Sequence, residues 1–174
     1  TGWRFEKKNF SWQANLFQRN ITDFIDWNRL SIDVPYQSTN EGNLKTFGFS
    51  THINFQKTIN AHQIQLKVSY TYLDPIWSNY QTNVISKYSL ESLRHQIIGQ
   101  VNYQYQKWQI NLSNRYQKRL SKSDYILTDL RINYLQNKFT YFLDAQNIGN
   151  ATYVEAGAVP MPGRWLSVGI KFKS

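Results

Sequence analysis

Apolar and polar residues alternate with a period of two along most of this chain. Residues 62–73, HQIQLKVSYTYL, show the pattern most clearly: from Ile64 onwards every second residue is Ile, Leu, Val or Tyr, and the residues between them are Gln, Lys, Ser or Thr. Because successive side chains of a β-strand point to opposite faces, this alternation predicts a strand with one apolar and one polar face. The segment is also longer than most strands of globular domains.

The same alternation recurs in eight segments, and a truncated one surrounds Trp3 and Phe5. The eight segments are residues 10–16, 46–55, 62–73, 93–106, 108–117, 126–134, 138–146 and 166–172. Ile25 and Trp27 continue the pattern and are expected to prolong the first segment. A length of about 10 residues suits a strand that crosses a bilayer at a tilt. The chain is therefore predicted to be all-β, with eight to nine long strands.

The connections between these segments alternate in length. Short turns are expected near residues 57–61, 106–107 and 136–138. Longer connections are expected at 29–43, 75–91 and 150–163, with a shorter one of the same parity at 119–124. Short turns at one end and longer loops at the other are typical of an antiparallel up-and-down meander that crosses a bilayer.

The composition decides between two environments for the apolar face. In a soluble sandwich this face would point inward and the polar face would meet water. Only 18% of the residues are charged, however, and 4 Pro and 8 Gly are few for a sandwich of tight turns. Aromatic residues also gather near segment ends, for example Trp12, Trp108 and Tyr134, as in the aromatic belts of membrane proteins. These features favour a transmembrane β-barrel, and no stretch is apolar enough for a membrane-spanning helix.

Charge and reactive residues indicate neither nucleic-acid binding nor catalysis. The net charge is +9, but the Lys and Arg residues are spread singly and form no basic stripe, so no nucleic-acid partner is predicted. The chain has no Cys, and His52, His62 and His95 lack metal-ligand spacing, so neither a metal nor a cofactor is expected. No nucleophile or phosphate-loop motif is present, and Asp23 and Asp26 are interpreted as a polar interface. An enzyme is not predicted.

Residues 125–172 resemble the end of a TonB-dependent outer-membrane receptor. The segment YILTDLRINY (125–134) resembles the antepenultimate strand of that family, and FTYFLDAQNIGNATYVEAG (139–157) resembles its penultimate strand and a recurrent element here formed by Asn147, Ile148, Asn150 and Tyr153. VPMPGRWLSVGIKF (159–172) is similar to the family's final loop and strand, with Pro162, Gly163, Arg164 and the terminal aromatic Phe172. Upstream, LFQRNITDFIDW (16–27) and LRHQ (93–96) fit the same family.

This resemblance implies that residues 1–174 are the C-terminal eight to nine strands of a barrel of about 22 strands, without the plug domain that fills its lumen. The implied location is the outer membrane of a Gram-negative bacterium. The implied function is uptake of a scarce nutrient, driven by the inner-membrane TonB complex through the missing N-terminal part. The other implied partners are the rest of the barrel with its plug, the barrel assembly machinery, the lipid bilayer and a surface lipoprotein lid. The sequence of the C-terminal motif resembles that of Bacteroidetes receptors for cobalamin or siderophores.

The resemblance also orients the barrel and suggests site residues. The family's final strand ends at the periplasmic side, so the loops at 29–43, 75–91 and 150–163 are expected outside the cell and the short turns in the periplasm. Trp77, Tyr80 and Tyr88 in the longest loop are the candidate ligand contacts, because aromatic faces supply contact area with few rotatable bonds. Charged residues expected to face the lumen are Arg94, Arg115, Asp129, Arg131 and Asp144. Asn147, Asn150 and the Pro162–Gly163–Arg164 turn are interpreted as structural rather than as substrate contacts.

Two other functions stay open at this point. The first is a small self-contained outer-membrane barrel that acts as an adhesin or an enzyme. The second is a soluble carbohydrate-binding β-sandwich, in which the same three loop aromatics would stack on sugars. Partitioning into detergent would separate either membrane barrel from the sandwich.

Overall fold

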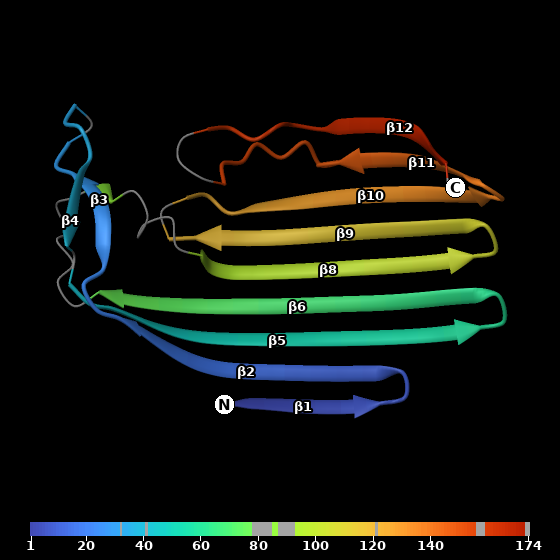
Figure 1. Cartoon of the computed structure of the whole chain (residues 1–174), viewed down its shortest axis with the longest axis horizontal. Helices are drawn as coiled ribbons and strands as arrows, with labels where there is room; N and C mark the ends of the chain where they lie inside the picture. Colours follow the sequence, from blue (N-terminus) through green and yellow to red (C-terminus); the bar gives the residue numbers. More distant parts are fainter. Residues whose placement is uncertain are drawn as a thin grey trace.

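Nine long strands form one antiparallel sheet (Figure 1). The computed structural model describes residues 1–31, 33–40, 42–77, 85–86, 93–120, 122–155 and 159–172. The strands are, in their order across the sheet, β1 (Gly2–Lys7), β2 (Phe10–Ile21), β5 (Leu44–Ile59), β6 (His62–Trp77), β8 (Leu93–Tyr105), β9 (Trp108–Arg119), β10 (Tyr125–Gln136), β11 (Phe139–Gln146) and β12 (Trp165–Phe172). This order follows the chain, which confirms the predicted all-β antiparallel meander.

Four two-residue turns join neighbouring strands at one end of the sheet, on the right in Figure 1. They lie at residues 8–9, 60–61, 106–107 and 137–138. In three of them the first residue, Asn60, Gln106 or Asn137, has a positive φ of about 50°. Asn reaches this left-handed region more readily than most residues, which favours a tight reversal at those points. The first predicted turn, 57–61, is too long, because β5 stays paired with β6 as far as Ile59.

The longer connections lie at the opposite end, on the left in Figure 1, where a second small sheet forms. Its strand order is β4-β3-β7, from β3 (Ile25–Arg29), β4 (Gln37–Asn40) and β7 (Ile85–Ser86). The alternation suggested that Ile25 and Trp27 prolong β2. They belong to this small sheet instead. The chain bends after Ile21, and Asp23 takes a left-handed conformation with a φ of 54°, which ends the extended strand. Asp26 is fully buried in this small sheet, where its carboxylate accepts the backbone N–H of Trp27 at 2.7 Å.

The register of the long strands aligns apolar residues in rows across the sheet. One row runs through Phe10, Phe55, Leu66, Val101, Leu112, Leu130, Ala145 and Leu166. We call the face that carries this row the outer face and the opposite face the inner face. Polar groups on the outer face are paired: Thr51 accepts a hydrogen bond from Trp12 Nε1 at 2.9 Å, and Thr128 donates to Asn114 Oδ1 at 2.6 Å. The outer face therefore presents an apolar surface.

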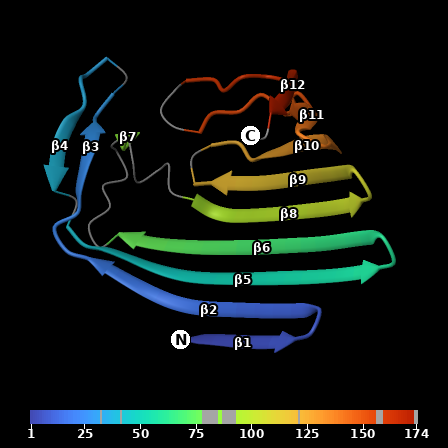
Figure 2. The same cartoon turned by 45° about the vertical axis from the view of Figure 1, so that its right-hand side comes forward.

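No second layer formed by the described residues covers the outer face. Among the residues that the structure describes, the buried hydrophobic ones are Ala14, Leu44, Tyr125 and Leu127. Leu66 is 39% exposed and Val168 is 75% exposed, although both lie on the apolar face. The sheet instead curves, so that β11 and β12 are seen nearly end-on when β5 and β6 still lie across the view (Figure 2). In the described ranges no helix is long and apolar enough to cross a membrane.

A charge on the outer face should destabilise the protein, whereas a charge on the inner face should not. Leu66→Lys places an ammonium group in the middle of the apolar face, which should cost about 2–4 kcal/mol in a bilayer. Gln65→Lys, its neighbour on the inner face, should change the free energy of unfolding by less than about 0.5 kcal/mol. Denaturant unfolding of the intact protein in lipid vesicles measures both. Equal costs at the two positions would contradict the assignment of the faces.

Candidate functional site

The inner face carries many amide side chains. One row in register consists of Gln56, Gln65, Asn102, Asn111, Arg131, Asp144 and Ser167. Asn102 Nδ2 donates to Gln65 Oε1 at 3.3 Å, and Asn111 Nδ2 donates to Asn102 Oδ1, so the amides form a chain of hydrogen bonds across three strands. Uncharged groups with both donors and acceptors suit contact with water or with another polar polypeptide surface.

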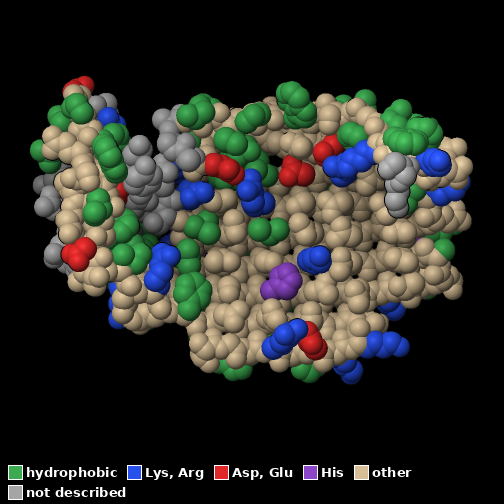
Figure 3. Space-filling model, viewed as in Figure 1, with side chains coloured by type: hydrophobic (Ala, Val, Ile, Leu, Met, Phe, Trp, Pro, Cys, Tyr) green, Lys and Arg blue, Asp and Glu red, His purple; other side chains and the backbone are tan. Residues whose placement is uncertain are grey.

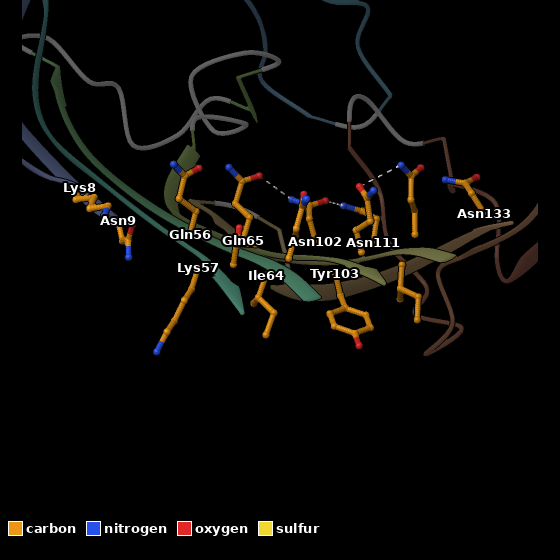
Figure 4. Close-up of a pocket in the computed structure, with 15 residues that line it drawn as sticks. Lys8, Asn9, Gln56, Lys57, Ile64, Gln65, Asn102, Tyr103, Asn111 and Asn133 are labelled. Carbon is orange, nitrogen blue, oxygen red and sulfur yellow. Dashed lines mark hydrogen bonds between the residues drawn. The ribbon is translucent and has the colours of Figure 1, made fainter. Parts of the chain in front are cut away.

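A hollow of about 790 Å³ lies over this amide row, lined largely by Gln and Asn of β5, β6, β8, β9 and β10. Figure 4 shows Gln56, Gln65, Asn102 and Asn111 pointing to the hollowed side of the sheet, whereas Ile64 points away from it. Figure 3 shows that this face is mostly neither hydrophobic nor charged, with basic groups scattered over it. Across the described part of the chain, no group of three or more His, Cys, Asp or Glu could hold a metal ion.

Four charged residues on β9, β10 and β11 that were predicted to face the lumen bond to one another or to the last loop. Arg131 lies 3.7 Å from Asp144, its register partner on β11, and its guanidinium carbon lies 4.9 Å from the centre of the Phe142 ring. Arg115 pairs with Glu155 at 2.8 Å. The fourth predicted residue, Asp129, accepts the backbone N–H of Asn147 at 2.8 Å. These four predicted residues therefore share the inner face; that this face lines a lumen stays a prediction.

Arg94, the fifth residue expected to face the lumen, lies on the outer face instead. Its Nη1 is 2.5 Å from Asp74 Oδ1, and its guanidinium carbon lies 5.4 Å from the centre of the Tyr72 ring. Both partners have the parity of Leu66 on β6 and so belong to the outer face. The cause is a bulge between Leu93 and His95, where one extra residue interrupts the strict alternation.

Asn147 holds the loop between β11 and β12 in shape. It is buried, has a φ of 47°, and its side chain bonds three backbone groups: Oδ1 accepts from Ala151 N at 2.8 Å, and Nδ2 donates to Ala151 O at 2.9 Å and to Pro162 O at 3.3 Å. Asparagine fits both requirements, because it tolerates the left-handed region and carries a donor and an acceptor. The geometry is that of a loop-closing residue.

Asn150, Gly163 and Arg164 close the same loop at its base. Asn150 Oδ1 accepts the backbone N–H of Arg164 at 2.9 Å, and Arg164 Nε donates to the carbonyl of Ile148 at 2.8 Å. A Cβ on Gly163 would lie 2.8 Å from Asn150 Oδ1, so any larger residue here would displace the Asn150 side chain from this position. The spacing N-x-x-N followed by PGR thus corresponds to one hydrogen-bonded unit.

The loop then turns back over the inner face. The ring of Tyr153 lies 4.7 Å from that of Tyr125, and Glu155 reaches Arg115 on β9. Burial raises the pKa of the Tyr153 hydroxyl, and the charge of Glu155 raises it further, so this tyrosine stays protonated above its ordinary range. Neither Glu155 nor Tyr125 was among the predicted site residues, because nothing in the alternation indicates a contact such as that of Glu155 with Arg115, which lies 40 positions away.

The remaining predicted residues are placed only in part. Trp77 is the last residue of β6 and pairs with Leu44, and Tyr80 and Tyr88 lie outside the described residues. Phe172 ends β12 at the turn end of the sheet, with its ring 5.5 Å from that of Phe139.

Comparisons with known proteins give a family and a fold. The family model described as TonB dependent receptor-like, beta-barrel, matches residues 1–148. The FrpB iron transporter from Neisseria meningitidis is similar in structure: its F3-3 variant has a TM-score of 0.68 at 14% identity over 97% of this chain, and its F5-1 variant has a TM-score of 0.68 at 14% identity over 98%. The chain spans 30% of either transporter chain. The search of curated proteins found no match.

Removal of the Asn147 side chain should loosen the loop between β11 and β12. Asn147→Ala leaves part-buried backbone groups without these partners, which should cost about 1–3 kcal/mol. Trypsin cleavage after Arg164 should then accelerate at least about fivefold, because the loop opens more often. Gln146→Ala, at an exposed neighbouring position, is the matched control. Mass spectrometry of the fragment measures the rate of cleavage. An unchanged rate in Asn147→Ala would show that the loop does not depend on this residue.

Proposed function

The chain belongs to the TonB-dependent receptor-like β-barrel family, and on this premise we propose that it is the C-terminal wall section of a receptor that takes up a scarce nutrient. Receptors of this family reside in the bacterial outer membrane and are transporters rather than enzymes. The chain is part of a larger barrel of this kind. The whole receptor's substrate, plug and energising partner belong to the proposal.

One observation carries the proposal: the sheet has an uncovered apolar face and an amide-rich opposite face. Such a sheet is stable only where each face meets its own kind of surroundings, hydrocarbon on one side and water or polar protein on the other. β1 and β12 each have a neighbour on only one side within the described ranges. Unpaired backbone groups in lipid cost several kcal/mol each, so both edges need further strands. We assign these to the rest of a barrel of about 22 strands.

The inner wall would face a plug domain supplied by the rest of the receptor. The hollow over Gln65, Asn102 and Asn111 offers donors and acceptors without net charge, which suits a polypeptide that must be held and then displaced. Its size, about 790 Å³, is large enough for several side chains of such a partner. The energy for this movement would come from the inner-membrane TonB complex, acting through a part of the receptor outside this chain.

The loop end of the sheet would form the external mouth. This assignment rests on the family's usual placement of the final strand end, here Phe172, at the periplasmic side. The loops at 29–43, 75–91 and 150–163 then lie outside the cell, and Trp77, Tyr80 and Tyr88 are the proposed ligand contacts. Tyr153 and Glu155 would line the mouth from the last loop, because that loop bends over the inner face.

The proposed substrate is a metal chelate or cobalamin. The similar structures are described as iron transporters, which favours an iron chelate, although identity of 14% supports only the fold. The C-terminal motif suggests a Bacteroidetes receptor, which would work with a surface lipoprotein lid and depend on the barrel assembly machinery for insertion. A soluble sandwich is not supported, because no second sheet covers the apolar face of the described strands. A self-contained barrel is not supported either, because β1 does not pair with β12.

Uptake assays test this function in a strain that lacks the complete receptor. We expect the deletion to abolish energised uptake of one ligand among labelled iron chelates and cobalamin, and the wild-type gene to restore it. Trp77→Ala in the restored receptor should raise the half-saturating ligand concentration about tenfold, since a buried aromatic contact is worth about 1–2 kcal/mol. Trp108→Ala, at the turn end of β9, is the control. Unchanged uptake of every ligand after deletion would refute the proposed substrate class.

A further inference from the structure

Within the described residues of the central strands β5, β6, β8 and β9, charged residues of the outer face lie only at its two ends. On β5 they are Lys45 and Lys57, at opposite ends of the strand. On β6 Asp74 lies near the loop end and His62 lies at the turn end, and the outer-face residues between them are Ile64, Leu66, Val68, Tyr70 and Tyr72. The outer face therefore contains a band without charge, bounded by two ionisable rows.

The width of this band matches the hydrocarbon layer of an outer membrane. From Ile64 to Tyr72 the charge-free band rises by eight residues, which is about 26 Å along the strand and about 20 Å along the membrane normal at a tilt of about 40°. The ionisable residues that bound it, His62 and Asp74, are separated by about 30 Å along the same normal. The apolar belt of outer-membrane barrels is about 25 Å tall. The row beyond Tyr72 therefore lies at the level of the lipid headgroups.

The loop-end row is rich in cations. It contains Lys45 on β5, Arg94 on β8 and Lys118 on β9, with Asp74 as its acidic member on β6. Lys118 is the register partner of His95 and is exposed, and Lys45 is exposed with its Nζ 4.8 Å from the centre of the Phe47 ring. Neighbouring strands are about 4.8 Å apart, so Arg94 and Lys118 lie side by side on this row. Lys45 pairs with Ile76, four residues beyond Tyr72, and therefore lies about 20 Å from Lys118.

Arg94 is held in place on this row by its neighbours. Asp74 binds its Nη1, and the Tyr72 ring lies under the guanidinium. Beside it, His95 Nδ1 and the Tyr70 hydroxyl share a hydrogen bond of 3.0 Å. The centres of the His95 and Tyr72 rings lie 5.0 Å apart. A guanidinium has five N–H donors, and the Arg94 side chain, which is 30% exposed, bonds Asp74 through Nη1. A fixed guanidinium of this kind suits bidentate binding of a phosphate.

We propose that this row on the outer face, with Arg94 and Lys118 as its principal contacts, binds the phosphate of a lipid headgroup in the outer leaflet. The acyl chains would lie along the charge-free band below, against Leu66, Val68 and Ile97. The site requires both parts, a phosphate at the row and chains on the band. It is separate from the nutrient site, which would lie inside the barrel and on its external loops.

Native mass spectrometry of the complete receptor in detergent tests this site. The probe is dioleoyl phosphatidic acid, and dioleoylglycerol, which has the same chains without the phosphate, is the matched lipid. We expect phosphatidic acid to bind and dioleoylglycerol to bind at least tenfold more weakly. Arg94→Gln with Lys118→Gln should weaken phosphatidic acid about fivefold for each cation removed, so about 25-fold in total. Arg94→Lys, which keeps the charge but loses the bidentate fork, should bind more tightly than Arg94→Gln and more weakly than the wild type when Lys118 is present.

Controls separate this site from general charge and from a site for free anions. Lys57→Gln removes an exposed cation from the turn end of the same face and should leave binding unchanged. A loss of equal size in Lys57→Gln would overturn the proposal, and so would wild-type binding in the double variant. Displacement of the lipid by millimolar inorganic phosphate would also overturn it, because the band would then contribute nothing. Heat-modified gel mobility reports folding, and if the double variant fails to fold, Lys118→Gln alone provides the test.

Discussion

The register of backbone pairing is the constraint on which the rest of the structure depends. The apolar row through Leu66, Val101 and Leu130 and the polar row through Gln65, Asn102 and Arg131 are one residue apart on every strand. A slip of one residue in a single strand would exchange its faces and place amides among apolar side chains. Continuous pairing from β1 to β12 therefore determines which side of the sheet is apolar. The two-residue turns, with Asn60 and Asn137 in left-handed conformations, leave little freedom for such a slip.

The same constraint explains how a sheet with so few buried apolar residues can form part of a barrel wall. A globular domain would cover its apolar face with a second layer, and the described part of this chain forms none. In the proposed receptor, membrane lipid would cover this face and the rest of the larger barrel would pair with both edges. At the loop end the chain closes over its own inner face, where Asn147 shapes the last loop and Glu155 ties it to Arg115. The sheet thus has an apolar outer face and an amide-rich inner face, and its last loop is bonded to the inner face at the loop end.

The periodicity of the sequence was sufficient to predict the long strands and their faces. It was insufficient to predict the structure where the period breaks. Strict alternation from Ile64 to Tyr72 identified β6, because side-chain direction in a paired strand follows sequence position alone. Arg94 was assigned to the wrong face because a bulge adds one residue, and a bulge leaves the composition of the strand unchanged. Ile25 and Trp27 continued the pattern but belong to another sheet, because the left-handed Asp23 turns the chain between them and β2. The contact of Glu155 with Arg115 depends on how a loop folds back, which local patterns do not contain.

A lipid-phase quenching scan along β6 tests the central claim most directly. Single cysteines from position 63 to 70 of the complete receptor, each carrying an environment-sensitive fluorophore, would be placed in vesicles whose acyl chains carry a quencher. The account predicts quenching that alternates with the sequence, strong at Ile64, Leu66, Val68 and Tyr70 and weak at the positions between them. Uniform quenching, or quenching that is strong at Gln65 and Lys67 instead, would contradict the assignment of lipid and lumen to the two faces.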